Sequence, residues 1–107
     1  MYDKEREAPR VNRLFLTSYV NREGEEQKSP VSLGRTLDIS VTGAGMEVFQ
    51  ELQVGSVMDL EFDLHDSLLT ARGKVVHSRR EVDGHYVVGI RFDEPQERLG
   101  KLLEQGE

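Results

Sequence analysis

Apolar and polar residues alternate along most of this chain, and a period of two is that of a β-strand buried on one face. The alternation is strictest where Met58, Leu60, Phe62 and Leu64 take turns with acidic residues. Similar stretches, rich in β-branched and aromatic residues, predict strands at 11–20, 32–39, 44–49, 68–78 and 86–92. The pattern thus predicts six short strands.

The segments between these strands carry turn signals. Residues 21–30 are polar and predict a loop, 53–56 contain a glycine and predict a turn, and the Asp-Gly pair at 83–84 predicts a hairpin. Near the end of the chain, Leu99, Leu102 and Leu103 are spaced as on one face of a helix, which we place at about 95–105. Six antiparallel strands and one helix predict a mainly β fold, a small antiparallel barrel with the helix over one end or side.

The 107 residues suffice for one domain with a modest core. We expect residues 1–10, which are highly charged, to form a flexible arm and residues 11–107 to form a single barrel domain. No apolar run approaches the roughly 20 residues of a membrane-spanning helix, so we expect no membrane insertion. The absence of cysteine and of an apolar leader favours a cytoplasmic location.

A net charge of −6 disfavours binding to a long nucleic acid, which usually needs a basic face. A small anionic ligand is still compatible, because it responds to charges within about 8–10 Å. The three histidines, His65, His77 and His85, lack a metal-ligand spacing, and no metal or other cofactor is predicted. No nucleophile or acid–base pair at a sensible spacing predicts an enzyme.

Two polar stretches carry the candidate chemistry. The first contains Arg6 and Arg10, whose guanidinium groups are suited to phosphates and to stacking on bases. The second contains Asp38, Ser40 and Gly43. A carboxylate can accept two parallel hydrogen bonds from a guanine edge, a hydroxyl adds a donor or acceptor, and a glycine allows close backbone approach. Together they predict a nucleotide site.

The predicted hairpin brings these stretches together. If the strands at 11–20 and 32–39 pair antiparallel about Gly24, the start of the first and the end of the second lie at the same end of the sheet. Arg10 directly precedes the first strand, and Asp38 ends the second. Both stretches are therefore expected at one rim.

Arg6-x-x-x-Arg10 followed by Asp38-x-Ser40-x-x-Gly43 resembles the signature of the PilZ domain, a bacterial receptor module for cyclic di-GMP. The segments 34–40, 72–76 and 88–92 resemble strands of that family. The resemblance implies a six-stranded antiparallel barrel with a C-terminal helix and no catalytic activity.

The resemblance also implies roles for the motif residues. Arg6 and Arg10 would contact phosphates and guanine faces, while Asp38, Ser40 and Gly43 would line the facing surface. Ligand binding would order the arm and change how the domain meets a downstream protein partner. Glu5, just before the first arginine, leaves open whether one or two ligand molecules bind.

Two alternatives compete with this interpretation. The same rim could serve a ligand-independent β-barrel module for protein interaction, which would hold a stable partner without nucleotide. A small oligonucleotide-binding barrel is the other, but its sites usually need exposed aromatic residues and a basic groove. The acidic charge and the seven aromatic residues (four Phe, three Tyr, no Trp) weaken that interpretation.

Overall fold

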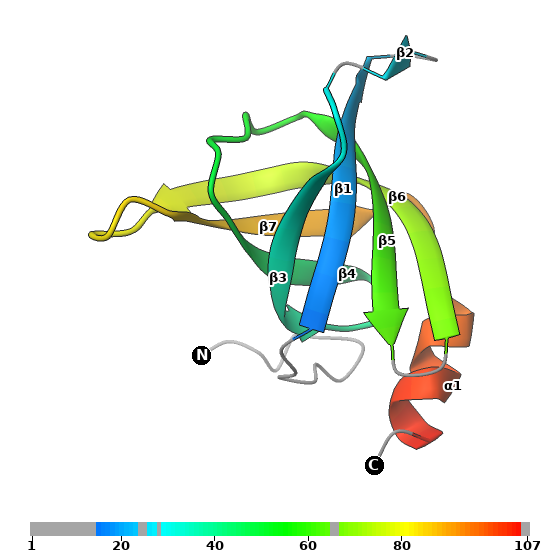
Figure 1. Cartoon of the computed structure of the whole chain (residues 1–107). Helices are drawn as coiled ribbons and strands as arrows, with labels where there is room; N and C mark the ends of the chain where they lie inside the picture. The colour runs from blue at the N-terminus through cyan, green and yellow to red at the C-terminus, as the bar shows by residue number, and fades with distance from the viewer. Residues whose placement is uncertain (1–14, 24–25, 28, 65–66, 106–107) are drawn as a thin grey trace.

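The computed structural model describes residues 15–23, 26–27, 29–64 and 67–105. Seven strands and one helix lie within these ranges (Figure 1). They are β1 (Phe15–Glu23), β2 (Glu26–Gln27), β3 (Ser32–Ile39), β4 (Gly43–Val48), β5 (Val57–Leu64), β6 (Ser67–Arg80), β7 (Tyr86–Phe92) and α1 (Glu97–Gln105).

Six of these strands close into an antiparallel barrel. Neighbours follow the order β1-β3-β4-β7-β6-β5, and β5 pairs back onto β1, so the ring is complete. Closure removes the unpaired edges that an open sheet of this size would expose. The strand β2 adds two residues to the far end of β1, outside the ring. The predicted mainly β fold, a six-stranded antiparallel barrel followed by a short helix, is confirmed.

The predicted polar loop at 21–30 is wrong at its start and again at Glu26 and Gln27, which form β2. Asn21, Arg22 and Glu23 continue β1, where Asn21 pairs with Met58 and Arg22 with Val57. Pairing with two neighbouring strands satisfies their backbone groups and outweighs their low strand propensity. The bounds of β3 and β7 agree with the prediction, and α1 begins two residues later than expected, at Glu97.

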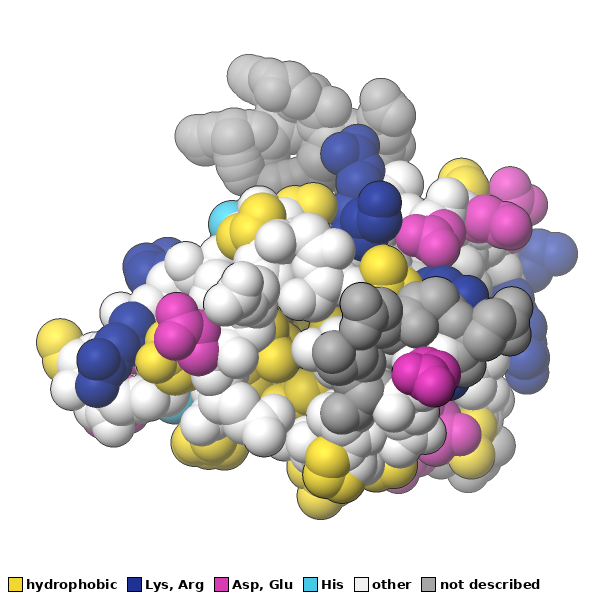
Figure 2. Space-filling model, turned by 90° about the horizontal axis from the view of Figure 1, so that it is seen from above, with side chains coloured by type: hydrophobic (Ala, Val, Ile, Leu, Met, Phe, Trp, Pro, Cys, Tyr) yellow, Lys and Arg dark blue, Asp and Glu magenta, His cyan; other side chains and the backbone are white. Residues whose placement is uncertain are grey.

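The barrel interior is filled by the apolar residues of the alternating pattern. Met58 and Phe62 on β5 are fully buried, and Phe62 meets Phe92 of β7 edge to face, with 5.9 Å between ring centroids. Two buried hydroxyl groups, on Thr17 and Thr36, hydrogen-bond to each other in the wall. Seen from above, hydrophobic side chains are visible in a hollow at the centre of the molecule, while charged ones lie mostly toward its margins (Figure 2).

The helix α1 packs at the end of the barrel where β3 turns into β4. Leu99 is fully buried there, and the backbone N–H of Gln96 donates to the carbonyl oxygen of Val41 at 2.8 Å. The side chains of Leu102 and Leu103, also predicted to pack, lie outside the described residues. Within the described ranges no helix is long and apolar enough to cross a membrane.

Tyr19 is an ionisable group of this core, and its substitution should alter the alkaline stability. Its hydroxyl donates to Oε1 of Gln50 at 3.0 Å, and burial raises its pKa above the ordinary value. The neutral form is thus favoured in the folded state, so its contribution is present below about pH 10 and lost as the pH rises through the folded pKa. As the pH rises above about 10, we therefore expect the Tyr19→Phe variant to lose less stability than the wild type, as measured by urea titrations. Parallel losses in the two proteins would contradict this.

Candidate functional site

Asp38 lies on the outer surface of the barrel. It pairs with Gly45 of β4, and its carboxylate oxygens lie 3.2 Å from the point where a Cβ of Gly45 would stand. Gly45 itself lies between the buried residues Ala44 and Met46, so in the pleat it faces outward. Asp38 therefore covers an outward-facing glycine.

A β-bulge turns Asp38 toward this surface. Thr36 is fully buried, and two residues further along a regular strand Asp38 would also point inward. The register of β3 against β4 shifts between Thr36 and Asp38, which inserts one residue and reverses the side on which Asp38 emerges.

A second β-bulge has the same effect on β6. Val75 is buried, and the register against β7 shifts between Val75 and His77, so His77 also emerges on the outer surface. Its ring covers Gly89, with Nε2 2.2 Å from where a Cβ of Gly89 would stand. Gly89 in turn pairs with Gly45. Asp38, Gly45, Gly89 and His77 thus form one row across four strands, here called the Asp38–His77 row.

A shallow cavity of about 410 Å³ lies along this row. The carboxylate of Asp38 lies over Gly45 and the imidazole of His77 lies over Gly89, so the row presents a carboxylate beside an imidazole. The residues that line it are Leu37, Asp38, Ala44, Gly45, Val76, His77, Val87, Val88, Gly89 and Ile90. The carboxylate can accept hydrogen bonds from N–H groups on the edge of an aromatic ligand, and the imidazole can stack on its face. These described residues include no lysine or arginine to hold a phosphate.

Ser40 and Gly43, the other predicted site residues, shape the turn between β3 and β4. The backbone N–H of buried Ser40 donates to the carbonyl oxygen of Gly43 at 2.8 Å, and its Oγ accepts from the N–H of Thr42 at 3.3 Å. A Cβ on Gly43 would lie 2.3 Å from the carbonyl oxygen of Ile90. Both residues hold the backbone that presents Asp38, and their contact with a ligand stays a prediction.

Arg6 and Arg10 lie outside the described residues. The antiparallel pairing of β1 with β3 is confirmed, and Phe15 lies opposite Thr36. This register centres the hairpin between residues 25 and 26, a residue or two beyond Gly24. The described chain thus enters β1 at the end of the barrel where β3 finishes, close to Asp38 (Figure 1).

The sequence interpretation missed most of the row. His77 was considered only as a metal ligand, and neither Gly45 nor Gly89 was assigned to the site. A glycine inside a strand often marks close approach of another group, and in the structure these two glycines are where Asp38 and His77 approach the sheet. Among the described residues no group of three His, Asp or Glu side chains could hold a metal ion.

Comparison with known proteins places this geometry in a family context. A family model described as "PilZ domain" matches residues 4–106, a range that includes both polar stretches. A search of curated proteins found no significant match.

Solved structures share the fold. The PilZ domain of YcgR from Escherichia coli, solved with cyclic di-GMP, superposes with a TM-score of 0.67 at 17% identity and covers 92% of this chain and 87% of its own. The PilZ domain of CeSA from a cellulose-synthesizing bacterium superposes with a TM-score of 0.60 at 16% identity. That match covers 91% of this chain and 93% of the other. A tetrameric PilZ protein from Xanthomonas campestris superposes with a TM-score of 0.55 at 20% identity, and the match covers 74% of this chain and 44% of that chain.

Proposed function

This chain belongs to the PilZ domain family, whose members are typically non-catalytic receptors for cyclic di-GMP, and we propose on that premise that it is such a receptor. The observation that carries the proposal is the Asp38–His77 row on the outer face of the barrel. It offers a hydrogen-bond acceptor and a stacking group side by side, which are features that suit a guanine base.

In the proposed complex a guanine lies against the outer face of the row, in contact with Asp38 and His77. Asp38 accepts hydrogen bonds from N1–H and the exocyclic amino group, whose spacing matches the two carboxylate oxygens. The ring of His77, held over Gly89, provides an edge or face against the purine. Ser40 and Gly43 fix the turn beside it and complete the predicted contacts.

The phosphates require cations, and the described lining of the cavity contains neither lysine nor arginine. We assign this role to Arg6 and Arg10. Phe15, the first described residue of β1, lies five positions after Arg10, and five extended residues span at most about 17 Å. Arg10, and Arg6 four positions before it, are therefore close enough along the chain to reach a ligand that lies on the row.

Ligand binding would then order residues 1–10 against the barrel and so alter the surface offered to a downstream protein. The free energy by which the ligand shifts the equilibrium toward the docked arm equals the difference in its binding free energy between the docked and undocked states. The alternative is a protein-interaction module that binds its partner independently of nucleotide.

Calorimetric titration with cyclic di-GMP tests the proposal. We expect saturable binding at micromolar concentrations, about 100-fold tighter than for GMP, because a second base and a second phosphate engage the site. Amide signals of residues 4–13 should shift on addition of the dinucleotide. Absence of heat at tens of micromolar ligand, from protein shown to be folded by circular dichroism, would refute the function. A stable partner retained without nucleotide would favour the alternative.

A further inference from the structure

A second surface lies across the barrel from the Asp38–His77 row. In the ring of strands, the β1–β5 pair stands opposite the β4–β7 pair. Its apolar part consists of Leu16 and Val20 on β1, Val31 just before β3, and Leu33 on β3, which pairs with Ser18. Leu16, Val31 and Leu33 are 56%, 64% and 61% exposed, large fractions for apolar side chains. These four residues are called the apolar column.

An acidic column runs beside it on β5. Its members are Asp59, Glu61 and Asp63, which alternate with the buried apolar residues of that strand. Val20 pairs with Asp59 and Ser18 with Glu61, so the two columns are about 5 Å apart across the strands. The outer face of β3, β1 and β5 is thus apolar along one side and acidic along the other.

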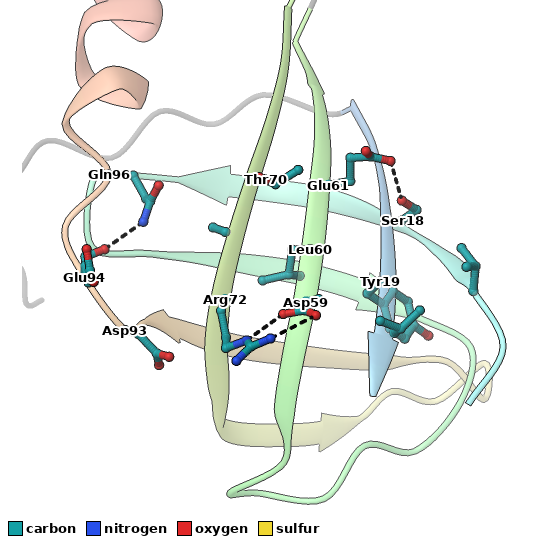
Figure 3. Close-up of a pocket in the computed structure, with 13 residues that line it drawn as sticks. Ser18, Tyr19, Asp59, Leu60, Glu61, Thr70, Arg72, Asp93, Glu94 and Gln96 are labelled. Atoms are coloured by element: carbon teal, nitrogen blue, oxygen red, sulfur yellow. Dashed lines mark hydrogen bonds and ion pairs between the residues drawn. The ribbon is translucent and has the colours of Figure 1, made fainter. Parts of the chain in front are cut away.

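A groove of about 790 Å³ opens along part of this face. Val20 and Val31 line one part of it, Asp59 and Glu61 another, and it extends over β6 to Asp93 and Glu94 ahead of α1. Figure 3 shows Asp59, Glu61 and Arg72 on the two strands that cross the groove, with Asp93 and Glu94 at its far side.

The charge of this face is not balanced within the described chain. Arg72 donates to Asp59 at 2.7 Å and, together with Arg22 at 3.3 Å, holds the pKa of that carboxyl below its usual value. Glu61, Asp63, Asp93 and Glu94 form no ion pair with any described residue, and all four are exposed. An occupant of this face should therefore bring positive charge as well as apolar surface.

The spacing of the acidic column fits a helix. Asp59 is held by Arg72 and Arg22, which leaves Glu61 and Asp63 to meet an added cation, and alternate residues of a strand are about 6.6 Å apart. Positions i and i+4 of an α-helix are separated by a rise of about 6 Å, so two successive lysines on one flank match these two carboxylates. We propose that this face docks an amphipathic helix of a partner protein, with the apolar stripe of the helix on the apolar column and flanking Lys or Arg side chains on the acidic column. The surface does not depend on nucleotide binding.

The probe is a synthetic helix of about 18 residues, long enough to fold alone, with a leucine stripe and lysines along one flank. Titrated into isotope-labelled full chain, it should shift the amide signals of residues 16–20, 31–33 and 59–63. The matched peptide with glutamate in place of lysine should bind at least about tenfold more weakly. The double variant Glu61→Lys with Asp63→Lys should lose about tenfold in affinity for the lysine peptide.

A charge-matched double variant distinguishes an effect of this face from an effect of the overall negative charge of the protein. Glu26→Lys with Glu51→Lys changes two exposed carboxylates outside both columns and should retain affinity within about twofold. Equal losses in the two double variants, equal binding of the two peptides, or shifts centred on the Asp38–His77 row would each overturn the proposal. So would concentration-dependent shifts of the same amides without peptide, which would assign the face to a second copy of the chain. Binding of the peptide by protein that fails to bind cyclic di-GMP would support this inference while refuting the proposed function.

Discussion

Replacing Asp38 with alanine is expected to weaken cyclic di-GMP binding by about 100-fold. In the proposed complex the carboxylate accepts two hydrogen bonds from one guanine, and its loss leaves both donors without a partner. Hydrogen bonds to a charged acceptor contribute about 1.5–3 kcal/mol each, and a net loss near 2.7 kcal/mol corresponds to that factor. Isothermal titration calorimetry measures it directly.

Two further variants make the result specific. Asp38→Asn keeps one acceptor oxygen and should bind with an affinity between those of the wild type and the alanine variant. Glu51→Ala removes an exposed carboxylate from the loop between β4 and β5, away from the row, and should leave affinity unchanged. Wild-type affinity in Asp38→Ala, with an unchanged melting temperature, would remove Asp38 from the site.

The fold was predictable because its signals are local and repeated. Met58, Leu60, Phe62 and Leu64 alternate with acidic residues, and this period of two appears in the structure as buried and outward-facing sides of β5. The Asp-Gly hairpin is likewise local, since Gly84 adopts a φ of 98° that glycine tolerates. Strand ends were less predictable, because Asn21 owes its strand conformation to pairing with residues far away in sequence.

The site was predictable only in part, for a related reason. A short motif marks Asp38, but the side of the sheet on which it emerges depends on a bulge between Thr36 and Asp38. A second bulge decides the side for His77, which meets Gly89 only through pairing of β6 with β7. An inserted residue reverses the pleat without leaving a composition signal, so strict alternation would have turned both groups inward.

Gly43→Ala is expected to destabilise the fold by about 3 kcal/mol. The new Cβ would stand 2.3 Å from the carbonyl oxygen of Ile90, which belongs to the backbone of β7 and cannot move aside as a side chain would. The pairing of Gly43 with Arg91 is where β4 begins on β7, so separation there also disturbs the turn that presents Asp38. Urea denaturation monitored by circular dichroism measures the loss.

Gly45→Ala is the matched substitution on the same strand, and its contrast with Gly43→Ala separates the scaffold from the site. Its Cβ would lie 3.2 Å from the carboxylate of Asp38, a side chain that can move by a few tenths of an ångström, so stability should change by less than about 1 kcal/mol. The methyl group nevertheless displaces the carboxylate of Asp38 from its position over Gly45, so affinity for cyclic di-GMP should fall at least about tenfold. If Gly45→Ala instead unfolds the protein as Gly43→Ala does, or binds with wild-type affinity, the row is part of the scaffold and not of the ligand site.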